Sequence, residues 1–238
     1  MEDFNKIIYQ PEITKEETSP IQKILQEAEL IKIETNDRNK DGLLLAADGS
    51  TSHYQNELHW QMLKTEAFRK WFAGSVVTHK DNQEPLMVFH STLKREFVGQ
   101  NLKLNERADD WNSFGVYFSS SKKATIDFFN TQYRDDVERF ERLLIGEPEE
   151  KENILADKKR YLLENQSITK TFAAFIKIEQ ALELSNHEKL MELSWAGFKR
   201  EDLINEHDGI IINHDSAFYD QYIVFKPENI VIIPSELD

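Results

Sequence analysis

The spacing of apolar residues divides the chain into a helical first third and a strand-rich remainder. In residues 19–33, apolar side chains recur every three or four positions, which predicts a helix beginning near Ser19. A second stripe of this kind predicts one continuous helical region over residues 56–74, which Gly74 ends. The segment between them, residues 36–52, is rich in Asp, Asn and Gly, and this composition is typical of a loop.

From residue 75 onward the period of the pattern shortens to that of strands. Residues 75–92 predict a strand, a polar turn and a second strand, and residues 114–121 predict a short strand bounded by Gly and Ser. Between Lys122 and about Leu144, apolar side chains step by three and four, which predicts a helix. Further strands are predicted over residues 171–184, 207–215 and 221–233.

This order of elements favours an α+β fold. We predict a partly helical N-terminal extension over residues 1–60 and one domain over residues 61–238. Within that domain, residues 134–165 are highly charged, which predicts a helical insertion with a solvated face.

Composition limits the classes of function. The chain has 238 residues, of which 29 are basic and 43 acidic, giving a formal net charge of −14. Such a surface disfavours simple binding to a phosphate backbone. The absence of cysteine excludes disulfide scaffolds, thiolate catalysis and thiolate zinc sites. No apolar signal core or membrane-length run is found, so we expect a cytoplasmic protein, either of a bacterium or delivered into one, with no membrane partner.

Common ligand-binding motifs are missing, and one weak metal pattern is present. The eight glycines form neither a dinucleotide-binding GxGxxG nor a phosphate-binding Walker loop. Residues 37–48 match the spacing of a calcium-binding EF-hand loop, but position 12 is Asp48 and the following segment is interrupted by Gly49. We therefore favour a polar turn, keep calcium at Asp37–Asp48 as the weaker alternative, and predict no other metal site.

Three strand-associated motifs remain in the order VFHST (88–92), FGVYFSSSKKATIDFF (114–129) and YDQYIVF (219–225). Together they resemble the ADP-ribosyltransferase fold of the H-Y-E group, and in particular the branch found in polyvalent proteins of phages and mobile elements. The resemblance covers about residues 65–233. It implies a sheet split into two parts around a cleft for NAD, which would be the substrate.

The first motif implies roles for three consecutive residues. In the family, the histidine that aligns with His90 binds an adenosine ribose hydroxyl, and the main chain that aligns with Ser91 holds the nicotinamide carboxamide. Thr92 completes this NAD-binding motif. Without the resemblance, His90 is more simply a hydrogen-bonded histidine at a strand end.

The second motif implies an aromatic sandwich. Tyr117 corresponds to the aromatic that stacks on nicotinamide, Thr125 to a hydroxyl on the carboxamide, and Phe128 to a second aromatic facing the first. An alternative stays open for Phe128, because Phe129 fits the helical stripe as well and either residue can belong to the core.

The third motif carries a substitution. The family has a catalytic Glu where this chain has Gln221, whose carbonyl can still accept a ribose hydroxyl but supplies no negative charge. Strand alternation predicts that Asp220 points to the opposite face. Glu206 and Asp208 could compensate only if their strand pairs near the site. Tyr219 stands where arginine-specific transferases carry Glu, so arginine is not the expected acceptor.

The expected function is mono-ADP-ribosylation: transfer of ADP-ribose from NAD to a host protein or nucleic acid with release of nicotinamide. The resemblance implies that His90, Tyr117 and Gln221 are the catalytic set. Two alternatives remain open: a weak or inactive module that binds NAD or ADP-ribose, and an acidic interaction protein of phage type whose charged surface does the work.

Overall fold

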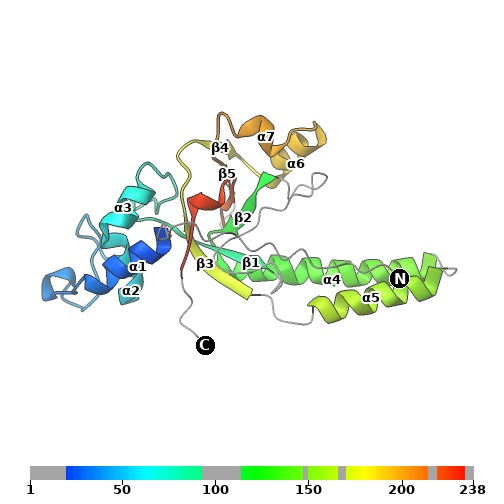
Figure 1. Cartoon of the computed structure of the whole chain (residues 1–238), viewed down its shortest axis with the longest axis horizontal. Helices are drawn as coiled ribbons and strands as arrows, with labels where there is room; N and C mark the ends of the chain where they lie inside the picture. Colours follow the sequence, from blue (N-terminus) through cyan, green and yellow to red (C-terminus); the bar gives the residue numbers. More distant parts are fainter. Residues whose placement is uncertain (1–19, 93–113, 147–149, 166–169, 214–218, 234–238) are drawn as a thin grey trace, which may run out of the picture.

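The computed structural model describes residues 20–92, 114–146, 150–165, 170–213 and 219–233 (Figure 1). Short helices lie on either side of a central sheet, and a pair of long helices projects from it. In chain order the elements are α1 (Pro20–Leu30), η1 (Thr35–Asp37), α2 (Glu57–Lys64), α3 (Glu66–Phe72), β1 (Met87–Thr92), β2 (Val116–Ser119), α4 (Lys122–Gly146), α5 (Lys151–Asn165), β3 (Lys170–Ile176), β4 (Ala181–Leu184), α6 (His187–Trp195), α7 (Arg200–Leu203), β5 (Gly209–Ile212), β6 (Gln221–Val224), η4 (Pro227–Asn229) and β7 (Ile230–Ile232).

The strands form one seven-stranded mixed sheet in the order β4-β5-β6-β2-β1-β3-β7. Only β4 and β5 pair in parallel, while the other neighbours are antiparallel. The predicted α+β class is confirmed at this level. The first strand predicted within residues 75–92 is wrong: these residues form only an isolated bridge between Thr78 and Pro85 before β1.

The helical region predicted over residues 56–74 is in fact two helices, and Thr65 separates them. Its backbone is extended (φ −66°, ψ 148°), so it ends α2 and begins α3. The Thr65 hydroxyl donates to Met62 O at 2.8 Å and accepts from Phe68 N at 3.0 Å. A threonine that caps two helices at once replaces the backbone bonds that a continuous helix would make.

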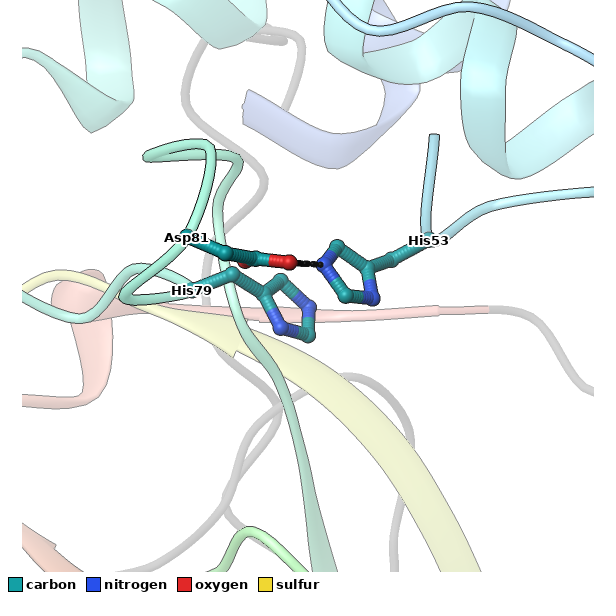
Figure 2. A group of neighbouring side chains, drawn as sticks. All are labelled: His53, His79 and Asp81. Carbon is teal, nitrogen blue, oxygen red and sulfur yellow. Dashed lines mark hydrogen bonds and ion pairs between the residues drawn. The ribbon is translucent and has the colours of Figure 1, made fainter. Parts of the chain in front are cut away.

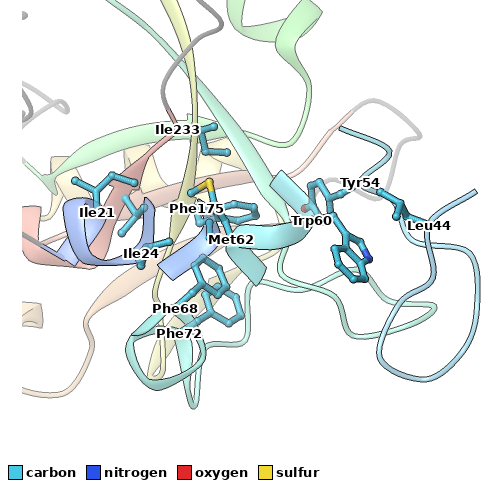
Figure 3. Close-up of a cluster of buried hydrophobic side chains, with 12 residues drawn as sticks. Ile21, Ile24, Leu44, Tyr54, Trp60, Met62, Phe68, Phe72, Phe175 and Ile233 are labelled. Atoms are coloured by element: carbon cyan, nitrogen blue, oxygen red, sulfur yellow. The ribbon is translucent and has the colours of Figure 1, made fainter. Parts of the chain in front are cut away.

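A shared core joins the N-terminal helices to the sheet (Figure 3). Phe175 of β3 is fully buried and meets Phe68 edge-on, with ring centroids 5.0 Å apart. Ile24 of α1 and Leu44 of the following loop are buried in the same cluster. Residues on both sides of position 60 therefore pack in one core, and the boundary drawn there stays a prediction.

The charged segment forms the helical pair α4 and α5, which lie side by side (Figure 1). Lys158 Nζ of α5 contacts Glu141 Oε1 of α4 at 3.1 Å, and Ile154 is buried while most of the other described side chains of α5 are exposed. The predicted helix over 122–144 is confirmed. In the part of the chain that the structure describes, no helix combines the length and apolar character needed to cross a bilayer.

Two helices between β4 and β5 were not predicted. The first, α6, begins at Asn186, whose side chain accepts from Lys189 N at 3.1 Å, and it buries Leu190 against the sheet. Its apolar face is short and flanked by charges, so the periodic signal is weak.

Candidate functional site

The motif-bearing strands meet where the sheet is most weakly paired. Strands β1 and β2 share a ladder of one register pair, Phe89 with Ser119, whereas β1 and β3 share six pairs and β2 and β6 share four. The sheet thus has two better-paired parts, β4-β5-β6-β2 and β1-β3-β7. We refer to the Phe89–Ser119 pair and its surroundings as the β1–β2 junction.

His90 completes the β1–β2 junction through its side chain. Its Nδ1 lies 2.6 Å from the carbonyl oxygen of Tyr117, and because a carbonyl only accepts, Nδ1 carries the proton. Continued antiparallel pairing from Phe89–Ser119 would set Ser91 opposite Tyr117, but the ladder stops before them. The imidazole Nδ1–H thus bonds to the Tyr117 carbonyl in place of a backbone N–H of the ladder.

Alternation along the strands sorts the side chains onto two faces. Tyr117, Ser119 and Gln221 share one face, since Ser119 pairs with Gln221 and Tyr117 pairs with Ile223. We refer to this as the Tyr117 face. Tyr117 is partly buried there and packs against the core cluster that contains Ile223. Tyr117 and Gln221 are diagonal neighbours, a spacing of ~7–8 Å that long side chains can bridge.

The His90 ring belongs to the opposite face. Its centroid lies 5.5 Å from that of Phe118 and 5.1 Å from that of Phe172, and both phenylalanines are buried in the core of that face. The proposed site residues therefore do not all lie on one surface. His90 reaches Tyr117 only along the plane of the sheet, through the β1–β2 junction.

Gly115 explains how β2 and β6 come so close. A Cβ at this position would lie 2.3 Å from Val224 O and 3.1 Å from the Ile223 side chain. Such a contact is impossible without moving a backbone, so only glycine fits. The Gly of the Gly-x-Tyr motif therefore allows the strand of Tyr117 to lie close to the strand of Gln221.

Gln221 carries an unusual polar atom. Its Oε1 is buried and accepts no hydrogen bond from any part of the chain that the structure describes. A buried acceptor without a donor costs about 1–3 kcal/mol. Such exceptions often mark a position that a water or a ligand completes. A hydroxyl group placed at this point of the Tyr117 face would satisfy it.

The three candidate carboxylates lie at different distances from Gln221. Asp220 directly precedes it, and Asp220 N donates to Ser120 Oγ at 3.0 Å. That the Asp220 side chain points to the opposite face stays a prediction from strand alternation. Asp208 O accepts from Phe225 N, so Glu206 and Asp208 lie near the far end of β6, about 13 Å along the strand.

The remaining predicted residues lie around β1 and the start of α4. Ser91 Oγ lies 2.7 Å from Thr171 Oγ1 of β3, and Thr92 ends β1. Thr125 Oγ1 donates to Ser121 O at 2.9 Å and lies 3.5 Å from Phe89 O, which brings the first turn of α4 against β1.

Phe128 is not a core residue of α4. Its exposed fraction is 50%, so the alternative that assigned it to the core is not supported. It lies one helical turn beyond Thr125, on the same side of the helix, as expected for residues three apart. Phe128 is thus a half-exposed aromatic side chain near the start of α4.

The loop of the EF-hand pattern uses its polar groups locally. Asn39 Oδ1 accepts from Asp41 N and Leu43 N, Asp48 Oδ1 accepts from Ser50 N, and Asp37 Oδ2 accepts from Glu34 N. These bonds are those of tight polar turns. Calcium at Asp37–Asp48 stays an untested alternative.

A cluster that the sequence did not indicate lies beside this loop (Figure 2). The rings of His53 and His79 stack with centroids 3.6 Å apart, and His53 Nε2 donates to Asp81 Oδ1 at 3.0 Å. This hydrogen bond holds the pKa of Asp81 below its usual range, and burial, with His53 next, lowers the pKa of His79. In the sequence, only the His-x-Asp spacing of residues 79–81 could have indicated this cluster. The third member, His53, lies 26 residues before His79, and no local pattern connects the two.

Comparison of this chain with family models, with curated proteins and with solved structures finds no match.

Proposed function

We propose that the protein is an NAD-dependent mono-ADP-ribosyltransferase whose site lies on the Tyr117 face at the β1–β2 junction. The resemblance of the three motifs to that family supports the proposal. The observation that carries it is the position of Tyr117 and Gln221: they occupy adjacent strands and one face, and the buried Gln221 Oε1 lacks a donor among the described residues.

In this proposal the nicotinamide of NAD lies between the rings of Tyr117 and Phe128, an arrangement that suits a planar aromatic cation. The main chain of Ser91, which the interrupted ladder leaves opposite Tyr117, pairs with the carboxamide, and Thr125 adds a hydroxyl. The 2′-hydroxyl of the nicotinamide ribose donates to Gln221 Oε1.

His90 is a positioning residue in this arrangement. Its Nδ1–H donates to the Tyr117 carbonyl and so fixes the strand that carries the stacking ring. The ring itself packs against Phe118 and Phe172 on the opposite face, so the expected contact of His90 with the adenosine ribose is not part of this proposal.

The reaction is a substitution at the anomeric carbon of the nicotinamide ribose. A nucleophilic oxygen or nitrogen of the acceptor forms a bond to this carbon while the bond to the ring nitrogen of nicotinamide breaks. The electron pair of that bond leaves with nicotinamide, which becomes neutral, and the acceptor releases its proton to solvent. Positioning of both reactants lowers the barrier. Gln221 orients the ribose, but it does not neutralise the positive charge that develops there, so turnover is slow.

One observation favours a second candidate, an NAD-binding module without turnover. Glu206 and Asp208 lie near the far end of β6, and alternation predicts that Asp220 points to the opposite face, so none of the three is expected to replace the missing carboxylate. Binding groups would then be present without the charge that stabilises the transition state.

The test measures nicotinamide release from NAD and the mass of modified species in a bacterial lysate. We expect slow release by the wild type. Phe128→Ala should weaken NAD binding by about 3–10-fold, because one stacking face is lost, and should fold, because the side chain is half exposed. Ile145→Ala, at the exposed far end of the same helix, is the matched control and should bind as the wild type does.

Gln221→Glu separates the two candidates. If the site is catalytic, restoring the carboxylate should raise nicotinamide release at least ~10-fold. If the wild type releases none but NAD raises its melting temperature, the binding module is correct. If NAD neither turns over nor shifts the melting temperature of either protein, both candidates are wrong and the acidic interaction protein remains.

A further inference from the structure

We propose that His53, His79 and Asp81 form a binding site for a divalent transition metal ion of the zinc class. Among the described residues, this is the one group of three or more His, Asp or Glu side chains whose ligand atoms all lie within 4.8 Å of one another. Figure 2 shows the three side chains converging from two separate segments of the chain.

The spacing of the groups matches what one ion requires. Zinc binds imidazole nitrogen and carboxylate oxygen at about 2.0–2.2 Å, so two ligands at angles between 90° and 109° lie roughly 3.0–3.5 Å apart. His53 Nε2 lies 3.0 Å and 3.1 Å from the two oxygens of Asp81. The rings of His53 and His79 stack with centroids 3.6 Å apart, and one nitrogen of His79 lies within 4.8 Å of the ligand atoms of His53 and Asp81. Because imidazole lone pairs lie in the ring plane, the two rings must tilt out of their parallel stack to point at one ion.

The chemistry of the three ligands selects the kind of ion. Two imidazoles and one carboxylate suit zinc and related transition metals, whereas magnesium and calcium prefer oxygen ligands alone. When the ion binds, it takes the place of the proton between His53 Nε2 and Asp81, and that proton moves to Nδ1 of the same ring. The site needs no cysteine, which this chain lacks.

A neighbouring hydroxyl orients His79, while His53 and Asp81 stay accessible to solvent. His79 Nε2 lies 3.5 Å from the Tyr54 hydroxyl, which itself accepts from Met87 N. Metal-bound histidines commonly hold their other nitrogen on such a neighbour. The side chains of His53 and Asp81 are 36% and 68% exposed, so solvent can supply a fourth ligand.

The ion would connect two segments that are distant in sequence. His53 lies in the loop before α2, and His79 and Asp81 lie in the turn before β1. Glu84 already bridges them, accepting from Ser52 Oγ at 2.7 Å and from His53 N at 2.8 Å. A metal at this point would strengthen that connection and stabilise the folded chain.

The test is calorimetric titration of the chelator-treated, desalted full chain with zinc chloride, followed by thermal melting. We expect one zinc per chain, and at zinc concentrations near 100 times the dissociation constant the melting temperature should rise by about 5–10 °C. Magnesium chloride should have no comparable effect.

Two variants and a control locate the site. His79→Ala and Asp81→Asn should each weaken zinc binding at least ~10-fold. Asp81→Asn keeps an acceptor for His53 Nε2 and so preserves the fold. His59→Ala removes an imidazole of α2 outside the cluster and should bind as the wild type does. Absence of zinc binding by the wild type, or unchanged binding by Asp81→Asn, would overturn the proposal.

Discussion

Replacing Gly115 with alanine tests how the two strands of the candidate site are held together. The added methyl would lie 2.3 Å from Val224 O, and real Cβ contacts below 3.0 Å essentially do not occur. The carbonyl belongs to the backbone of β6, so it cannot move aside by a side-chain rotation. Strand β2 must shift away from β6, at the end of a ladder of four register pairs.

The size of the effect follows from what this shift breaks. Loss of about two ladder hydrogen bonds, at a net 0.5–1.5 kcal/mol each, together with ~1–2 kcal/mol of packing strain, lowers the free energy of unfolding by about 2–5 kcal/mol. Urea unfolding followed by tryptophan fluorescence measures this directly. Nicotinamide release should fall as well, because Tyr117 moves with β2.

Gly146→Ala is the matched control, since no atom of the described residues lies within 4 Å of a Cβ at that helical position. Its free energy of unfolding should stay unchanged or rise by up to about 1 kcal/mol. If Gly115→Ala unfolds within about 0.5 kcal/mol of the wild type, the close approach of β2 and β6 is not as described.

Three further predictions concern stability. Phe175→Ala should lower the free energy of unfolding by about 3–5 kcal/mol in urea, because the ring is fully buried between the N-terminal helices and the sheet. Glu84→Ala should cost about 2–3 kcal/mol in the same assay, since it leaves the Ser52 hydroxyl and the His53 N–H without their acceptor. Burial raises the pKa of Tyr222 in the folded chain above the unfolded value of about 10. The contribution of the neutral Tyr222 phenol to the free energy of unfolding is therefore fully present below that pH and is lost as the pH rises above it. Tyr222→Phe should lose less stability than the wild type between pH 8 and pH 11.

Secondary structure was predictable where the local pattern agreed with the packing. The stripe after Lys122 became α4, and the apolar runs before Lys226 and after Asn229 became β6 and β7. The break at Thr65 was not predictable, because the apolar stripe continues through it and a side-chain hydroxyl decides the backbone. Helix α6 was missed because its buried face consists of little more than Leu190.

The residues of the candidate site came from the resemblance of the three motifs, and their roles stay predictions. Pairing of β2 with β6 places Tyr117 and Gln221 on one face. The single Phe89–Ser119 pair depends on strands far apart in sequence, which no local pattern encodes. The contact of His53 with Asp81 was not predictable either, because it depends on how two loops that are distant in sequence fold over the core.

The most direct test of the proposed function is a crystal structure of the protein soaked with NAD or nicotinamide. We expect the nicotinamide ring to stack on Tyr117 at the β1–β2 junction, with Phe128 on its other side. In the NAD complex, a ribose hydroxyl should donate to Gln221 Oε1. Density for the ligand elsewhere on the molecule, or a Tyr117 ring packed so that no ligand can reach it, would contradict the account.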